Sequence, residues 1–179
     1  METIQVRDRS FTVSISEQKI KQRVAEIAAQ ISHDLKDKHP LLIAVLNGSF
    51  VFAADLMRGI TTPCEISFVK MSSYTGTSST GNVKHLIGLQ ENLKGRNIII
   101  VEDIIDSGLT MQHLLEMLKE KEPAEIRIAS LLVKPNNLKV KLDISYCCFE
   151  IPNDFIVGYG LDYDGDGRNL PQIYTVIEK

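Results

Sequence analysis

The order of apolar segments along the chain predicts an α/β fold with a mainly parallel sheet flanked by helices. Two segments, Leu41–Leu46 and Asn97–Val101, are apolar at almost every position, which is typical of strands that are buried on both faces of a parallel sheet. Beside them lie stretches whose apolar residues recur every three or four positions, the periodicity of a helix. Strands that alternate with helices are typical of the α/β class.

The first half of the chain is predicted to contain two helices and three strands. Apolar residues recur at helical spacing from Ile20 to Leu35, and Ser16 before them is a suitable N-cap. His39-Pro40 ends this stretch. After the strand Leu41–Leu46 we expect a turn at 47–49, a helix over Phe50–Met57, a strand over Glu65–Met71, a long polar loop over 72–82 and a strand over His85–Leu89.

The second half is predicted to repeat the alternation and then to become rich in strands and turns. We expect a strand over Asn97–Val101, an amphipathic helix over Met111–Lys121, strands over Ile126–Val133, Tyr146–Phe149 and Phe155–Tyr159, and a final apolar stretch over Ile173–Ile177. A length of 179 residues suits one domain with one core. We therefore expect a single domain over 1–179.

Composition excludes several functional classes. Lys plus Arg is 20 and Asp plus Glu is 23, so the formal net charge is −3, which disfavours a nucleic-acid binder. The apolar stretches are far shorter than a membrane span, so no membrane partner is expected. The three cysteines, Cys64, Cys147 and Cys148, are odd in number and indicate no disulfide framework, so we expect a reducing, cytoplasmic location.

The segment VEDIIDSGLT, Val101–Thr110, carries the strongest constellation of polar residues. It follows a buried strand and precedes a predicted helix, which is where ligands bind in open α/β sheets. Ser107–Thr110 enters that helix, whose free N–H groups attract a phosphate, and Gly108 lets the backbone approach a ligand closely. The adjacent carboxylates of Glu102 and Asp103 suit a sugar diol or a hydrated divalent cation.

The alternative is that these residues have no ligand. Glu102, Asp103 and Asp106, taken singly, are ordinary turn residues, and Ser107 is an ordinary N-cap. Three carboxylates at this spacing repel one another, however, unless a cation or a ligand rich in hydrogen-bond donors lies among them. The grouping therefore favours a binding site.

This segment resembles the phosphoribosyl-pyrophosphate signature of the type I phosphoribosyltransferases, in the form found in the hypoxanthine-guanine branch. Further matches follow in the family's order: Leu46–Ser49, Ser73-Tyr74, Leu132–Lys134, and Asp154–Tyr159 with Leu161–Tyr163. The resemblance covers nearly the whole chain. It implies the type I fold, with a core over about 35–150 and a small hood formed by the N-terminal and C-terminal segments.

The resemblance also implies a reaction: Mg²⁺-dependent transfer of the 5-phosphoribosyl group from phosphoribosyl pyrophosphate to N9 of hypoxanthine or guanine. Glu102 and Asp103 would hold the ribose hydroxyls, and the metal would be held by these two residues and Asp162. The 5′-phosphate would be bound by Ser107, Gly108, Leu109 and Thr110, and the pyrophosphate by Leu46, Asn47, Gly48 and Arg168.

Two features of the pyrophosphate loop stand out within the resemblance. The family often has a non-proline cis peptide at the first step of this loop, here Leu46-Asn47, which is a rare bond elsewhere. Asn47 stands where the family commonly has lysine or arginine, so the loop carries one cation less. Contacts made by the backbone need no particular side chain at this position.

The purine base would be bound and activated by a second group of residues. Asp106 would face N7 as the general base, and Lys134 would donate to the exocyclic O6, which selects 6-oxopurines over adenine. Phe155 would stack on the base and Ile156 would offer backbone groups to its edge. Asp162 would link the base pocket to the metal.

Ser73 and Tyr74 match a mobile loop that closes over the site and excludes water from the reacting ribosyl carbon. The family is usually dimeric or tetrameric, so a homodimer or homotetramer is expected. The substrates would be phosphoribosyl pyrophosphate and a 6-oxopurine base.

Three alternatives remain open from the sequence. A relative that prefers xanthine would differ in contacts made by backbone atoms near 155–162. A regulator of the same fold that binds RNA or DNA should carry a basic face, and the net charge of −3 argues against it. A domain that has lost activity should have lost Asp106 or Lys134, and both are present.

Overall fold

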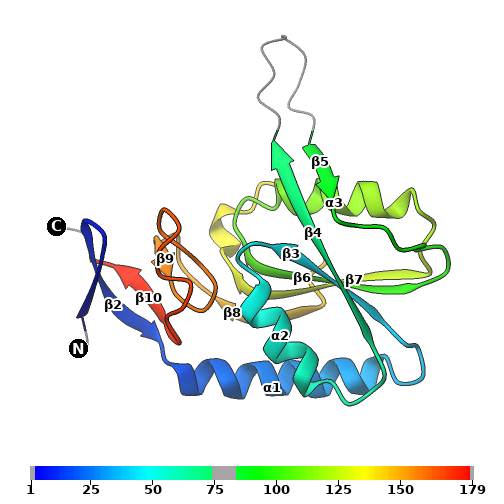
Figure 1. Cartoon of the computed structure of the whole chain (residues 1–179), viewed down its shortest axis with the longest axis horizontal. Coiled ribbons are helices and arrows are strands. Elements are labelled where there is room, and N and C mark those ends of the chain that lie inside the picture. The colour runs from blue at the N-terminus through cyan, green and yellow to red at the C-terminus, as the bar shows by residue number, and fades with distance from the viewer. Residues whose placement is uncertain (1–2, 74–83, 178–179) are drawn as a thin grey trace, which may run out of the picture.

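The structure, a computed structural model, describes residues 3–73 and 84–177 and contains two sheets (Figure 1). The six-stranded sheet has the order β5-β4-β3-β6-β7-β8. Strands β4, β3, β6, β7 and β8 run parallel, and β5 is antiparallel to β4. The mainly parallel α/β sheet is therefore confirmed. Its strands are β3 Leu41–Leu46, β4 Glu65–Ser73, β5 Lys84–Ile87, β6 Asn97–Ile105, β7 Glu125–Val133 and β8 Tyr146–Glu150.

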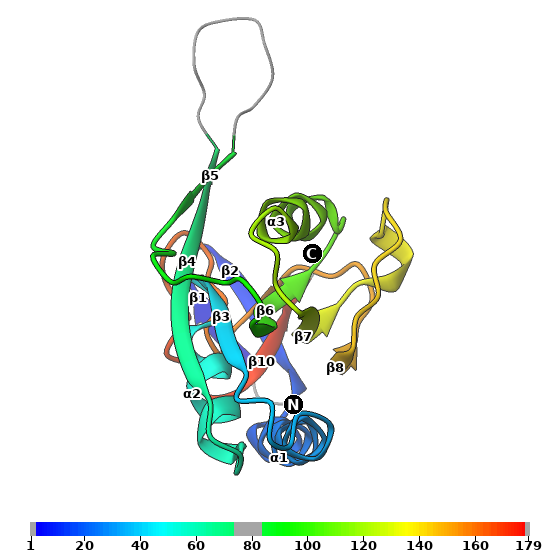
Figure 2. The same cartoon turned by 90° about the vertical axis from the view of Figure 1, so that its right-hand side faces the viewer.

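Three helices cover this sheet: α1 Glu17–Asp34, α2 Phe50–Gly59 and α3 Leu109–Lys119. Helix α3 lies on one face, and α1 and α2 lie on the other (Figure 2). The alternation of side chains along β3 explains its apolar sequence, because Leu42 and Ala44 join the core cluster of α1 and α2 while Ile43 and Val45 join the cluster of α3. Both faces of the central strands are thus buried.

Helix α1 forms where its periodicity predicts it. The Ser16 hydroxyl caps the first turn by accepting the Lys19 N–H at 3.4 Å. One face of the helix buries Ile20, Val24, Ile27, Ala28 and Ile31 against the sheet and α2. This burial, rather than intrinsic propensity, stabilises the helix.

Several predicted ends differ from the structure, and one difference bears on function. Strand β6 continues to Ile105 because β7 pairs with it along its whole length, with Glu102 opposite Ser130 and Ile105 opposite Val133. Glu102 and Asp103 therefore lie inside the strand and not in the turn after it. Helix α3 begins at Leu109, two residues before the predicted start, and its N-cap is Gly108 rather than Ser107.

A second, antiparallel sheet joins segments from distant parts of the chain, in the order β1-β2-β10-β9. Its strands are β1 Thr3–Val6, β2 Arg9–Ile15, β9 Ile156–Val157 and β10 Ile173–Val176. A small core of Val6, Phe11, Val157 and Tyr174 lies on it. This sheet is the hood that the family resemblance implies, although the sequence pattern did not predict β1 or β2. The single domain over 1–179 stays a prediction.

None of the helices in 3–73 and 84–177 is both long enough and apolar enough to span a membrane.

Candidate active site

The predicted site residues in 46–48 and 102–110 and Lys134 lie at the carboxyl ends of β3, β6 and β7. These three strands pair in parallel, so the loops that follow them, 46–49, 106–108 and 134–139, leave the sheet at the same edge. This is the edge at which open α/β sheets bind ligands. The fold therefore brings together residues that are up to about ninety positions apart in sequence.

A pocket of about 110 Å³ opens where β6 passes into α3. It is lined by Glu102, 104–108, Thr110 and Met111. Gly108 has a φ of +80°, and a Cβ at this position would lie 2.9 Å from Val140 Cγ2, so the turn requires glycine. The N-terminus of α3 faces a small polar pocket, which suits a phosphate group.

The loop after β3 lies directly against the carboxylate of Asp103. A Cβ added at Gly48 would lie 1.5 Å from Asp103 Oδ2, so only glycine leaves room for this side chain. The Ser49 hydroxyl, fully buried, donates to the carbonyl of Val45 at 2.6 Å and fixes the start of α2. The Leu46-Asn47 peptide bond is cis, as the resemblance implies.

We expect Gly48→Ala to lower kcat/KM for phosphoribosyl pyrophosphate by about 100-fold, since displacement of a catalytic group by roughly 1 Å has an effect of this size. The new methyl would push Asp103 from its position. Gly59→Ala is the matched control, because its Cβ would crowd Ala28 at 2.8 Å, far from the site. Steady-state kinetics should show the loss in the first variant alone, and equal losses in both would contradict the role of the loop.

Glu102 and Asp103 form a close pair of carboxyl groups. The Asp103 N–H donates to Glu102 Oε1 at 3.2 Å, and the Ile104 N–H donates to Asp103 Oδ1 at 2.9 Å. Burial raises the pKa of Glu102 well above its ordinary value, and the charge of Asp103 raises it further. A cation beside the pair would relieve this repulsion, so the donor set fits a hard divalent ion.

The predicted third metal ligand, Asp162, is engaged elsewhere. It pairs with Arg168 at 2.6 Å and accepts the Gly165 N–H at 2.7 Å. Within the described residues, no three His, Cys, Asp or Glu side chains are grouped so as to hold a metal ion. Mg²⁺ needs no such group, because it usually binds one or two carboxylates together with substrate phosphates and water.

Asp106 is held by two side chains from the segment after β7. Lys134 Nζ donates to Asp106 Oδ2 at 3.3 Å, and the side-chain amide of Asn137 donates to Asp106 Oδ1. Lys134 is buried, with 9% of its surface exposed, whereas the Asp106 side chain is 47% exposed. The predicted base and the predicted O6 donor are therefore neighbours, and Asn137 is a partner that the sequence reasoning missed.

Phe155 lies on the hood, in a group of rings. Its centroid is 5.5 Å from that of Tyr163 in an edge-on arrangement, and the guanidinium of Arg9 lies over it at 5.5 Å. Phe155 is 40% exposed, so part of the ring is available to stack on a ligand. Arg9 is a second residue that the sequence reasoning missed. Ile156 next to Phe155 lies in β9, where its backbone is opposite Thr175 of β10.

The turn that follows β9 connects the hood to the pyrophosphate loop. A Cβ added at Gly160 would lie 2.2 Å from the carbonyl oxygen of Gly48, so the two backbones touch. Arg168 donates to the carbonyl of Gly160 at 2.7 Å and pairs with Asp162. In this structure Arg168 therefore stabilises the turn after β9. Its contact with pyrophosphate stays a prediction.

Ser73 ends β4, and Tyr74 falls outside the described residues, as does most of the predicted loop over 72–82. The closing role of this loop stays a prediction.

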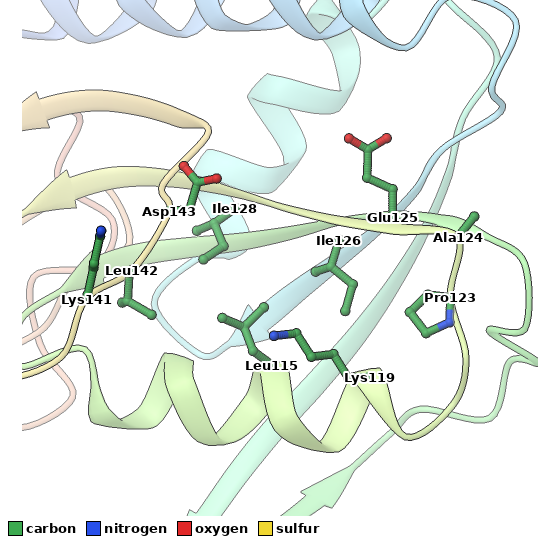
Figure 3. A pocket seen from close by; sticks show the side chains of 10 residues that line it. All are labelled: Leu115, Lys119, Pro123, Ala124, Glu125, Ile126, Ile128, Lys141, Leu142 and Asp143. Carbon is green, nitrogen blue, oxygen red and sulfur yellow. The ribbon is translucent and has the colours of Figure 1, made fainter.

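Another pocket, of about 410 Å³, lies between the last turns of α3 and the start of β7 (Figure 3). Its lining includes Leu115 and Lys119 from the last turns of α3, and Glu125 and Ile126 from the start of β7. It is therefore at the amino end of the strands, opposite the edge that carries Asp106. None of the predicted site residues lines it.

Comparison with known proteins gives a consistent result. Residues 14–164 match the family model of the phosphoribosyl transferase domain. A hypoxanthine-guanine phosphoribosyltransferase from Streptococcus pyogenes is 46% identical over 165 residues, which is 92% of each chain, and one from Streptococcus mutans is 44% identical over 93% of each chain. A crystal structure of a hypoxanthine-guanine phosphoribosyltransferase from Bacillus anthracis superposes with a TM-score of 0.86 at 42% identity, and the match covers 93% of this chain and 98% of that one.

Proposed function

The chain belongs to the phosphoribosyl transferase domain family, and from that membership we propose that it transfers the 5-phosphoribosyl group of phosphoribosyl pyrophosphate to N9 of hypoxanthine or guanine. The products are inosine or guanosine monophosphate and pyrophosphate. The enzyme therefore serves purine salvage. The observation that carries the proposal is the juxtaposition of the β6–α3 phosphate pocket with the Asp106–Lys134 pair.

The pocket at the start of α3 binds the 5′-phosphate in this proposal. Ser107, Gly108, Leu109 and Thr110 surround the phosphate with backbone N–H groups and hydroxyls. The loop Leu46–Gly48 binds the pyrophosphate through its backbone, and Asn47 supplies no charge there. Because both ends of phosphoribosyl pyrophosphate are held, C1′ is fixed in front of the base. The two reactants are then already oriented for the reaction.

Asp106 and Lys134 act on the base. As N9 bonds to C1′, the bond from C1′ to the pyrophosphate oxygen breaks, and pyrophosphate leaves with the electron pair. The proton on N7 passes to the Asp106 carboxylate, which keeps the purine ring from accumulating positive charge. Lys134 donates to O6 and stabilises the negative charge that grows there. Phe155 stacks on the base, and Ile156 and Asp162 flank it.

Glu102, Asp103 and Asp162 are the residues that would hold Mg²⁺, and in this structure Asp162 is paired with Arg168. When bound, Mg²⁺ neutralises the phosphate charges of the substrate and of the leaving group. The carboxylates of Glu102 and Asp103 also accept hydrogen bonds from the ribose hydroxyls. The observation that supports a metal site here is the close, mutually repelling pair of carboxyl groups on β6.

Assembly and location follow the family pattern. We propose a homodimer or homotetramer, with no nucleic-acid or membrane partner. We propose the cytoplasm as the location, since all three cysteines are free.

Steady-state assays with phosphoribosyl pyrophosphate and each of hypoxanthine, guanine, xanthine and adenine test the proposal. We expect rapid turnover with hypoxanthine or guanine and only a slow residual turnover with adenine. Xanthine as the best substrate would favour the xanthine-preferring alternative. No turnover with any base would overturn the transferase function.

We expect Lys134→Ala to reduce the preference for hypoxanthine over adenine by about 10- to 100-fold, because the variant loses a charged donor to O6. The measurement is the ratio of kcat/KM for the two bases. Lys139→Ala is the matched control, since Lys139 is an exposed lysine in the same segment. An unchanged ratio in Lys134→Ala would remove the contact with O6 from the scheme.

A further inference from the structure

Asn137 contacts the proposed general base and has no role in the scheme above. Its side-chain amide donates to Asp106 Oδ1, while Lys134 Nζ donates to Oδ2 of the same carboxylate. The two partners of Asp106 differ in the length and mobility of their side chains. Lys134 has a long, flexible side chain that is needed at O6 of the base, whereas Asn137 has a short side chain.

The backbone around Asn137 holds it in place beside Asp106. The Lys134 N–H donates to the carbonyl of Ile105 at 2.9 Å, and the Lys139 N–H donates to the carbonyl of Ser107 at 2.9 Å. These two bonds fix the segment on both sides of Asp106. Between them, the Asn137 N–H donates to the carbonyl of Lys134 at 3.0 Å and closes a single helical turn over Pro135–Asn137.

We propose that Asn137 is a positioning residue that fixes the rotation of the Asp106 carboxylate and directs Oδ2 toward N7 of the base. This inference rests on the proposed transferase function. The Asp106 side chain is 47% exposed, so little else restrains its rotation. When the base binds, Lys134 moves from Oδ2 to O6, and the amide of Asn137 on Oδ1 then keeps the carboxylate in place.

The proton transfer follows from this arrangement. The N7–H bond breaks and an O–H bond forms at Oδ2, while the electron pair of the N7–H bond stays in the purine ring. Oδ1 keeps the hydrogen bond that it accepts from Asn137 throughout. The NH2 group of Asn137 can only donate to this oxygen, so it favours the orientation in which Oδ2 receives the proton.

Substitution at Asn137 separates this role from simple packing. We expect Asn137→Ala to lower kcat about 10- to 100-fold, the effect of losing one hydrogen bond to a charged group, with the KM for phosphoribosyl pyrophosphate unchanged. Asn137→Asp keeps the shape but places a second carboxylate against Asp106, so we expect it to lower kcat at least as much. Asn136→Ala is the matched control, because Asn136 is the exposed neighbour of the same residue type.

A second comparison uses the Asp106→Asn background, with product followed over long incubations. If Asn137 acts through Asp106, adding Asn137→Ala there should change the residual rate by less than twofold. Three outcomes would overturn the inference. The first two are a wild-type kcat in Asn137→Ala and full activity in Asn137→Asp. The third is a tenfold loss caused by Asn137→Ala that persists in the Asp106→Asn background. Absence of turnover in the unaltered protein would instead overturn the proposed function, and this inference with it.

Discussion

Asp106→Asn should lower kcat for hypoxanthine about 10²- to 10⁴-fold, which is the range that a positioned general base contributes. Asparagine has the shape of aspartate but cannot accept the N7 proton. It also leaves Lys134 and Asn137 facing an amide instead of a carboxylate. Binding of phosphoribosyl pyrophosphate should survive, because the phosphate pocket and the loop after β3 are unaltered.

The experiment compares turnover with direct binding of phosphoribosyl pyrophosphate by calorimetry in the presence of Mg²⁺. Asp143→Asn is the control, since it removes one carboxylate from an exposed position in the segment after β7. Turnover of Asp106→Asn at the wild-type rate would remove the assignment of the base. Loss of phosphoribosyl pyrophosphate binding in this variant would instead assign Asp106 a role in binding that substrate.

Removal of divalent metal should abolish turnover, the largest effect that we expect. The phosphates of the substrate would otherwise enter a site in which β6 already carries two closely spaced carboxyl groups. The helix N-terminus contributes only about half a positive charge, and Arg168 is paired with Asp162. A divalent cation is the remaining source of neutralising charge in this scheme.

Protein treated with excess chelator should lose activity, and added Mg²⁺ should restore it fully. Chelator already saturated with Mg²⁺ is the control, because it tests whether the chelator itself inhibits. Binding of phosphoribosyl pyrophosphate should weaken in parallel with turnover. A metal-free enzyme with full activity would contradict the placement of a cation at Glu102 and Asp103.

The fold was predictable wherever one segment determines its own structure. The helix after Ser16 and the strand Leu41–Leu46 have the predicted bounds or nearly so, because burial on one helical face or on both faces of a strand leaves a clear pattern. Strands β1 and β2 are short and only partly buried. They pair with each other, and β2 also pairs with β10. Such pairing across the chain leaves no local signal.

The site residues also fall into two groups: those that a local sequence pattern predicts, and those whose contacts join distant segments. Glu102, Asp103 and Asp106 could be predicted because they form a short run at the carboxyl end of one buried strand. The contact of Asn137 with Asp106 joins two segments that are 31 residues apart. A partial signal existed, because β6 and β7 are adjacent and parallel, so residues after Val133 must lie near those after Ile105. The contact of Arg168 with Asp162 and Gly160 depends on side-chain rotamers that no spacing specifies.

The pairing of β2 with β10 has a consequence for protein synthesis. Ile15 is opposite Ile173, so translation must add 173 − 15 = 158 residues before this ladder can close. At about 5–20 residues per second, this delay is roughly 8–30 s. During that time β1 and β2 form at most an isolated hairpin, which is marginally stable in water. The free edge of β2 is then open to neighbouring chains, whereas the six-stranded sheet, whose last strand ends at Glu150, can form earlier on the ribosome.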